Sequence, residues 1–347
     1  MTQSLANPVK IGRFTLEKPL ALAPMCGITD VIERPKNRKF GASLCFTQMV
    51  SAEGYVRESN RTRELLDYTP ADDPLGVQIF GSTPEVLARV ARDICDRYEV
   101  QWIDLNMGCP VRKVACHEAG SGLLKNLPLV RQIWEAMRKA LPNENFTVKV
   151  RAGWDDKSLV IDELAEMADG IGLDLLTIHP RTRAQGYSGQ ADWSRIARLK
   201  ERCKTTPVFG SGDLLAPQAI RAMMEETGVD GCSLARGAIG NPWIFSRGLA
   251  LLEGESDPGE PTNRELFEVI CDHLRGCTRT YGDLRGVKMF RPHLAGYLRG
   301  RRNATQMRRQ IFGIKTAEEL EDVLRNFLLG EHIDPDASPG TQNQEVA

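Results

Sequence analysis

The chain has 347 residues, enough for two ordinary domains or for one large barrel with an appended module. Its 45 Lys and Arg balance 46 Asp and Glu, and 41% of its residues are hydrophobic, which excludes a disordered or fibrous protein. No apolar run reaches the roughly 18 to 20 residues of a membrane span, and residues 1–8 do not resemble a signal peptide. We therefore expect a cytoplasmic protein with no membrane partner, and a monomer by default.

Eight short apolar runs rich in β-branched residues occur in the first two-thirds of the chain. They are continuous rather than alternating, which is typical of strands buried on both faces in a parallel sheet covered by helices. The runs are Leu20–Met25, Leu44–Val50, Leu75–Gly81, Trp102–Gly108, Thr147–Gly153, Leu175–Arg181, Pro207–Asp213 and Gly231–Gly237.

Segments of helical periodicity separate most of these runs, and several of them begin with proline or an N-capping residue. A strand followed by a helix, repeated about eight times in roughly 250 residues, predicts an α/β fold of the TIM (β/α)8 barrel type, with a doubly wound open sheet as the alternative. Val9–Lys18 indicates a short hairpin at the bottom of the barrel. The helical segments are Pro84–Tyr98, Pro128–Leu141, Val160–Ile171, Trp193–Cys203 and Pro217–Thr227.

The chain changes character after a last barrel helix that follows Trp243. We expect a barrel domain over 1–250, a linker over 251–262, a helical bundle over 263–330 and a disordered tail over 331–347. Arg264–Gln310 contains 11 Lys and Arg against 4 Asp and Glu, a net charge of +7. A basic helical module attached to an acidic barrel indicates a polyanionic partner.

The strand ends carry residues suited to binding a phosphate-bearing cofactor. In Gly210–Asp213 and Ala235–Gly237, glycines allow backbone N–H groups to approach phosphate oxygens, and Arg236 adds a positive charge. No G-x-G-x-x-G or Walker motif occurs, which argues against a Rossmann dinucleotide site or a nucleoside triphosphate site. Ordinary turns are also rich in glycine, so this pattern alone leaves both readings open.

Two cations and one thiol stand out near the same strand ends. Lys149 and Arg151 alternate with valines, so both should point into the barrel, towards an anionic flavin or, for Lys149, towards Asp104. Cys109 is the only one of nine cysteines that lies between a glycine and a proline, and a thiol there could serve as a nucleophile or a proton donor. The odd number of cysteines, without a C-x-x-C pair or a Cys/His cluster, predicts reduced thiols and no metal site.

Six motifs follow one another along the predicted barrel: Ala23–Asp30, Gln78–Gly81, Asp104–Pro110, Lys149–Trp154, Ile178–Arg183 and Gly240–Trp243. Together they resemble the bacterial tRNA-dihydrouridine synthases, over about residues 9 to 325. The basic segment is similar to the helical domain of that family, with Lys288 and Arg291 on its RNA-facing helix, and we expect Arg301 and Arg302 to contact the RNA backbone.

The resemblance implies FMN as cofactor, NADPH as reductant, and reduction of the uracil C5–C6 bond in tRNA. By position, Pro24, Met25 and Cys26 would lie against the isoalloxazine, and Gln78 and Lys149 at its pyrimidine edge. Asn106 and Arg151 would orient the uracil, with hydride from reduced FMN to C6 and a proton from Cys109 to C5. His179 would assist the residues expected around the phosphate and ribityl chain, which are Ser211, Gly212, Asp213, Ala235 and Arg236.

Several residues depart from the family pattern. Cys26, Ser211 and Ala235 are conservative in size, whereas Gln48 and Glu33 are expected nearer the substrate and leave open which uridine or RNA class is used. Ribosomal RNA is therefore an alternative substrate. A small-molecule FMN oxidoreductase of the dihydroorotate dehydrogenase or old-yellow-enzyme type, or an RNA-binding protein with an inactive barrel, are the competing classes. Cys116 would be a packing residue or a second thiol.

Overall fold

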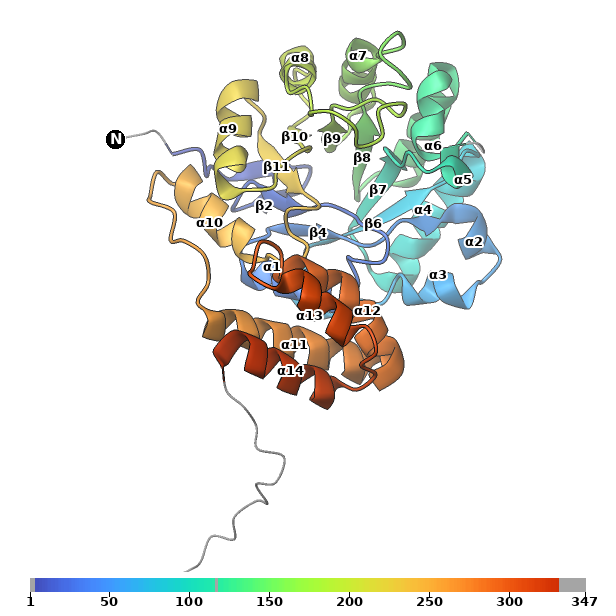
Figure 1. Ribbon diagram of the computed structural model, residues 1–347. Helices are drawn as coiled ribbons and strands as arrows, with labels where there is room; N and C mark the ends of the chain where they lie inside the picture. Colours follow the sequence, from blue (N-terminus) through green and yellow to red (C-terminus); the bar gives the residue numbers. More distant parts are fainter. Residues whose placement is uncertain (1–3, 116–117, 331–347) are drawn as a thin grey trace, which may run out of the picture. The chain divides into compact units, whose positions relative to one another are not determined.

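A computed structural model describes residues 4–115 and 118–330, which form two compact units within Met1–Gly259 and Glu260–Ala347 (Figure 1). Cys116 and the tail expected over 331–347 lie outside the described residues. Within the described ranges, no helix combines the length and the apolar composition needed to cross a membrane.

The first unit is a closed barrel of eight parallel strands, which confirms the predicted TIM-barrel fold and excludes the open sheet. Neighbouring strands pair in the order β4-β3-β11-β10-β9-β8-β7-β6, and β4 pairs with β6 to close the ring. The strands are β3 (Leu20–Leu22), β4 (Leu44–Phe46), β6 (Leu75–Phe80), β7 (Trp102–Met107), β8 (Asn145–Arg151), β9 (Leu175–His179), β10 (Val208–Gly210) and β11 (Gly231–Leu234).

The predicted strands were too long at their carboxyl ends. Pro24–Met25 and Pro180–Arg181, for example, leave the hydrogen-bonded ladder and form loops at the barrel mouth. The run expected over Leu44–Val50 breaks after Phe46, and a separate short strand, β5 (Val50–Ser51), pairs with β6. Apolar composition continues into these loops because their side chains line a pocket, so it does not mark the end of strand pairing.

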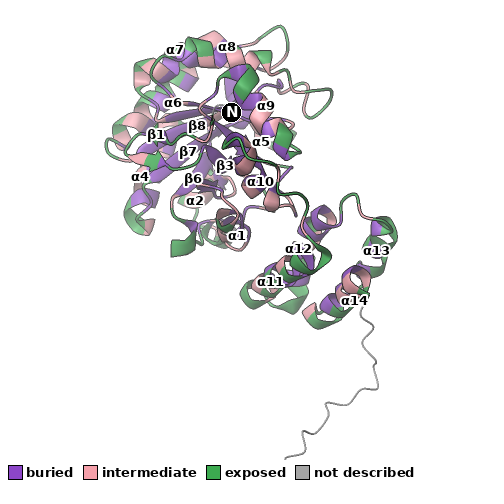
Figure 2. Ribbon diagram, turned by 90° about the vertical axis from the view of Figure 1, so that its left-hand side faces the viewer, coloured by how far each residue is buried: buried purple, intermediate pink, exposed green. Residues whose placement is uncertain are grey.

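Amphipathic helices surround the barrel, with their buried residues facing the strands (Figure 2). Pro84 and Pro217 begin two of these helices at the predicted residues, since proline is tolerated in the first turn. The helices are α1 (Glu33–Lys39), α4 (Pro84–Tyr98), α6 (Leu127–Ala140), α7 (Ile161–Ile171), α8 (Ser194–Arg202), α9 (Pro217–Thr227) and α10 (Trp243–Leu252), with shorter turns at α2 (Ala52–Val56), α3 (Asn60–Glu64), η1 (Pro70–Asp72), α5 (Arg112–Ala115) and η2 (Gly120–Lys125).

The predicted hairpin is present as β1 (Val9–Ile11) and β2 (Phe14–Leu16), with Gly12 at its turn. Asn145 at the start of β8 donates a 2.9 Å hydrogen bond to the carbonyl of Ile11, which ties the hairpin to the amino ends of the strands. Apolar side chains from both, Trp102 among them, fill the interior there. Polar chemistry is therefore left to the opposite, carboxyl end of the barrel.

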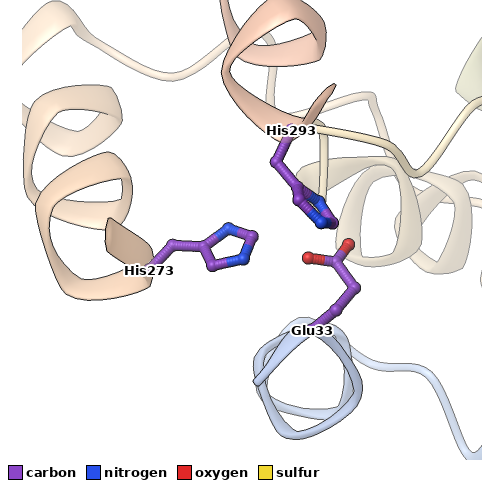
Figure 3. A group of neighbouring side chains, drawn as sticks. All are labelled: Glu33, His273 and His293. Atoms are coloured by element: carbon purple, nitrogen blue, oxygen red, sulfur yellow. The ribbon is translucent and has the colours of Figure 1, made fainter. Parts of the chain in front are cut away.

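The second unit contains α11 (Asn263–Tyr281), α12 (Asp283–Tyr297), α13 (Ala304–Ile311) and α14 (Ala317–Leu329). Thr262 and Glu265 form a capping box at the start of α11. His273 on α11 and His293 on α12, both labelled in Figure 3, bring their rings to a 4.5 Å centroid separation. Nδ1 of His273 lies 3.2 Å from the Tyr297 hydroxyl. The helices thus pack around an aromatic cluster between α11 and α12.

Candidate active site

A pocket of about 610 Å³ opens at the carboxyl ends of the barrel strands. Parallel strands in a closed barrel all end at one rim, so residues far apart in sequence meet there. The structure brings together the fourteen barrel residues selected from the sequence: Pro24, Met25, Cys26, Gln78, Asn106, Cys109, Lys149, Arg151, His179, Ser211, Gly212, Asp213, Ala235 and Arg236.

A chain of hydrogen bonds, here called the Asp–Gln–Asn relay, runs across β8, β7 and β6 to the Cys109 loop. Asp104 accepts from Thr147 Oγ1 at 2.6 Å and from Gln78 Nε2 at 2.7 Å. Gln78 Oε1 accepts from Asn106 Nδ2 at 2.8 Å, and Asn106 Oδ1 accepts from the Cys109 backbone N–H at 3.0 Å. Asn106, expected to orient uracil, thus also fixes the loop that carries the thiol.

Asp104 is buried at the start of the relay. Burial raises its pKa to about 6, although hydrogen bonds from Gln78 and Thr147 favour the charged form. Lys149 forms no salt bridge with Asp104 or with another carboxylate among the described residues, although the Asp104 charge still acts on it and opposes the lowering of its pKa. Burial and then the neighbouring Arg151 lower the pKa of Lys149 to about 8.

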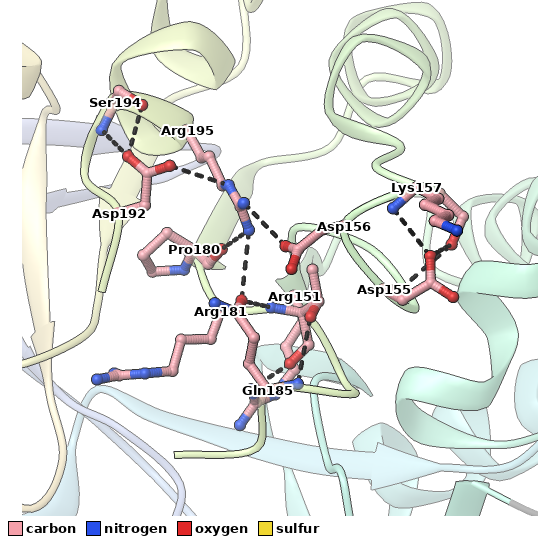
Figure 4. Close-up of polar contacts among 12 residues, drawn as sticks. Arg151, Asp155, Asp156, Lys157, Pro180, Arg181, Gln185, Asp192, Ser194 and Arg195 are labelled. Carbon is pink, nitrogen blue, oxygen red and sulfur yellow. Dashed lines mark hydrogen bonds and ion pairs between the residues drawn. The ribbon is translucent and has the colours of Figure 1, made fainter. Parts of the chain in front are cut away.

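Arg151 clamps two loops of the barrel mouth together. Its Nε donates to the Gly108 carbonyl at 2.9 Å, and its Nη1 donates to the carbonyls of Thr182 at 2.9 Å and Gly186 at 2.8 Å. Only 2% of the Arg151 surface is exposed. Arg195 reinforces the second of these loops by donating to Pro180 O at 3.2 Å, as Figure 4 shows. Arg151 therefore positions the Cys109 loop through Gly108, in addition to the bond from the relay to the Cys109 N–H.

His179 is a neutral hydrogen-bond donor to the pocket. Its Nδ1 accepts the backbone N–H of Arg181 at 3.3 Å, which places the ring proton on Nε2. Burial, followed by the positive charges of Lys149 and Arg151, lowers the pKa of His179 to about 2. The ring therefore stays uncharged at neutral pH.

The loop after β10 is held in a turned conformation. Gly212 has φ +121° and Asp213 has φ +57°. The Asp213 carboxylate accepts from Arg181 at 2.9 and 2.8 Å and from Arg236 at 3.1 Å. Because its carboxylate binds two arginines, Asp213 can contribute only its backbone N–H to an anionic group, and its side chain positions Arg236.

Sequence reasoning missed Tyr187, which lines the pocket and is 58% exposed. Its ring centroid lies 4.7 Å from the Arg236 guanidinium and 5.5 Å from that of Arg151. Gly186, one residue earlier, adopts φ +58° and lets the loop turn the ring towards the pocket. An aromatic residue beside a glycine in a polar loop after a strand was the available signal.

Of the departures expected nearer the substrate, neither Gln48 nor Glu33 lines this pocket. Gln48 Oε1 accepts the backbone N–H of Gly27 at 2.6 Å and so supports the loop of Met25 and Cys26. Glu33, labelled in Figure 3, begins α1 and accepts from Asn37 Nδ2 at 2.8 Å. Gln48 thus acts on the pocket through the Met25–Cys26 loop, whereas the Glu33 carboxylate bonds Lys36 and Asn37 within α1. Their effect on the choice of uridine stays a prediction.

The four cations selected in the helical unit differ in their surroundings. Lys288 and Arg302 are exposed. Arg291 is half-buried and donates to the Ile314 carbonyl at 3.1 Å, and Arg301 donates to Asn263 Oδ1 at 2.6 Å. Two of the four thus have internal contacts as well as positive charge.

Solved structures share this barrel fold. Histamine dehydrogenase from Rhizobium sp. 4-9 matches with a TM-score of 0.53 at 15% identity, covering 79% of this chain and 51% of that one. Morphinone reductase in complex with tetrahydroNAD matches with a TM-score of 0.51 at 12% identity, covering 74% and 93%. At such identities the likeness concerns the fold alone. It places this protein in the TIM-barrel class, and its own pocket lies at the carboxyl ends of the strands.

Sequence comparison supplies the family. The dihydrouridine synthase (Dus) family model matches residues 21–331. The tRNA-dihydrouridine synthase B of Pseudomonas aeruginosa is 37% identical over 320 residues, covering 92% of this chain and 95% of that protein. Its Pseudomonas putida counterpart is 35% identical over 303 residues, covering 87% and 89%. The chain belongs to the dihydrouridine synthase family of enzymes, which confirms the resemblance seen in its six motifs.

Proposed function

We propose that this enzyme reduces the C5–C6 double bond of specific uridines in tRNA, with FMN as cofactor and NADPH as reductant. The observation that supports this most is the position of Cys109, whose thiol lines the same pocket as the glycine-rich loops after β10 and β11. We place its action in the cytoplasm, where a tRNA substrate would be met, and keep a monomer as the default expectation.

The pocket residues fit a flavin mononucleotide. The 610 Å³ volume lies within the range of small-molecule sites, about 300 to 1,000 Å³. Lys149 is a cation in the pocket wall that forms no salt bridge among the described residues, which suits an anionic pyrimidine edge. Gly212 lines the pocket at a position with little room for a side chain, since a Cβ there would lie 3.1 Å from Pro180, and Arg236 bonds to the adjacent Asp213. Pro24, Met25, Cys26, Gln78, His179, Ser211 and Ala235 complete the proposed contacts.

When bound, reduced FMN supplies a hydride to C6 of uracil and is regenerated by NADPH. Cys109 supplies the proton to C5, so that one hydride and one proton saturate the bond and no group leaves. Burial raises the pKa of Cys109, although the Val111 backbone and Arg151 oppose the shift, and the thiol stays protonated at neutral pH. Asn106 and Arg151 line the pocket beside Cys109 and would orient the uracil.

The substrate uridine has to leave its stack to reach this pocket, and unpaired loop bases are the least costly to extrude. The basic helical unit would bind the RNA backbone through Lys288, Arg291, Arg301 and Arg302. Folded RNA with exposed loops is therefore the substrate class that both units favour.

The test is dihydrouridine formation in unmodified tRNA and, separately, in ribosomal RNA, incubated anaerobically with the protein, FMN and NADPH. Cys109→Ala should lower the yield at least about a hundredfold, the lower range for a general acid. Cys26→Ala is the matched control and should stay active, because alanine is usual there in the family. Dihydrouridine formed in ribosomal RNA alone would replace tRNA by ribosomal RNA as the proposed substrate. No product in either RNA, with free orotate or uracil reduced instead, would refute the proposal.

A further inference from the structure

Four residues on one face of α13 and its C-cap form a small groove of about 380 Å³. They are Thr305, Arg308, Arg309 and Phe312, spaced so that they share one side of the helix. The Phe312 side chain is 73% exposed, whereas phenylalanine is among the most often buried residues. An aromatic ring is thus presented to solvent between two arginines.

The position of Phe312 is fixed by its neighbours. Ile311 and Ile314 are buried on either side of it, so the backbone is anchored and the ring points away from the core. The Arg291 guanidinium lies 5.1 Å from the ring centroid, and the same side chain donates to the Ile314 carbonyl at 3.1 Å. The Arg291 guanidinium, fixed by its hydrogen bond, therefore lies against the Phe312 ring, which also lines the groove.

The charge around the ring favours a polyanion over an apolar partner. Arg308 and Arg309 are exposed, and Arg308 donates to the Ala295 carbonyl at 3.1 Å, which orders its guanidinium. A protein ligand that covered Phe312 would have to desolvate these cations. A nucleotide offers both complements, a flat base for the ring and a phosphate for the arginines.

We propose that Phe312 is a stacking platform for an unpaired nucleobase of RNA, with Arg308 and Arg309 contacting the phosphates beside it. The inference rests on the proposed RNA substrate, but it concerns recognition and not the reaction. Arg291, which contacts the Phe312 ring, would then hold this stacking platform in place in addition to binding the RNA backbone.

The first experiment measures the affinity of the full chain for an unmodified tRNA transcript. Phe312→Leu should weaken binding about 5- to 150-fold, the loss expected for one stacked base, and Phe312→Tyr should restore it. Leu284→Ala is the matched control, because Leu284 is 67% exposed on α12 and should not affect binding. A blunt RNA duplex without unpaired bases should bind Phe312→Leu and the wild type equally.

A second measurement detects stacking directly. All five tryptophans precede residue 244, so Phe312→Trp places the first one in the helical unit, and the tRNA transcript should quench its added emission. Equal tRNA affinity of Phe312→Leu and wild type, or equal weakening on the duplex, would overturn the proposal. Phe312-dependent tRNA binding without dihydrouridine formation would instead refute the proposed function and leave the platform standing.

Discussion

Asp104 and Gln78 lie opposite each other on β7 and β6, and the Gln78 amide donates a 2.7 Å hydrogen bond to the Asp104 carboxylate. An ionised carboxylate only accepts hydrogen bonds, so it sets the direction of the Gln78 amide. That direction makes Gln78 Oε1 the acceptor for Asn106, which leaves Asn106 Oδ1 for the Cys109 N–H. The buried Asp104 carboxylate thereby determines which group donates and which accepts in each hydrogen bond from Gln78 to Cys109, the proposed proton donor.

Asp104→Asn should therefore misplace the Cys109 loop. An asparagine can donate as well as accept, which allows the Gln78 amide to reverse, and we expect kcat to fall about ten- to a hundredfold. Thr147→Ser, which keeps the hydroxyl donor, is the control and should stay near wild type. Single-turnover rates of uridine reduction measure the effect, and a wild-type rate for Asp104→Asn would contradict the positioning role.

The raised pKa of Asp104 also predicts that the free energy of unfolding depends on pH, with Asp104→Asn as the reference. The folded pKa of Asp104 is raised to about 6, so the folded state binds more protons than the unfolded state below that value. This group's contribution to stability is thus largest in acid and is lost as the pH rises. Relative to Asp104→Asn, the wild type should lose about 1 kcal/mol of unfolding free energy between about pH 5 and pH 7. Urea unfolding at the two pH values checks this.

The lowered pKa of His179 predicts that its contribution to the free energy of unfolding changes with pH in the opposite direction. Its folded pKa is lowered to about 2, so only the unfolded state takes up a proton near pH 6. Its contribution to stability is present above about pH 6.5 and lost in acid, by about 1.4 kcal/mol from pH 7.5 to 5.5. His179→Gln should remove this slope. An unchanged slope would mean that His179 is not the neutral donor described above.

Arg236→Gln should weaken binding of FMN about 3- to 10-fold, because a partly exposed cation beside the proposed phosphate site is lost. Riboflavin lacks the phosphate, so its affinity should not change. Titration of the apoprotein with each flavin, followed by fluorescence quenching, separates the two. Equal losses for FMN and riboflavin would show that Arg236 contacts the ring or the ribityl chain instead.

Arg302→Gln should weaken tRNA binding while leaving NADPH oxidation intact, because Arg302 is exposed in the helical unit. Loss of one phosphate contact should reduce the slope of log affinity against log salt by about 1. Arg301→Gln should weaken binding too, but it also removes the contact with Asn263. A failure of NADPH oxidation in Arg302→Gln would contradict the division into two functional units.

The barrel and the membership of its pocket follow from local patterns in the sequence. The eight β-branched runs and the helices between them can each be predicted from a single segment of sequence. Closure of the sheet into a barrel then brings the carboxyl ends of all eight strands to one rim. Lys149, Arg151, Cys109 and the glycine-rich strand ends were predictable in this way, because position in a strand determines which end and which face a side chain occupies. Pro24, Met25, Cys26 and Asn106 were instead implied by the resemblance to the dihydrouridine synthases, and they line the same pocket.

Only the tertiary structure decided what those side chains bond to. The relay depends on the register of three strands, the Arg151 clamp on the conformation of two loops, and the exposure of Phe312 on how Ile311 and Ile314 are buried. Tyr187 enters the pocket through the path of a loop with no periodic pattern. Such contacts join residues that are distant in the chain, and their geometry is set by packing. The local pattern of hydrophobic and polar residues therefore does not predict them.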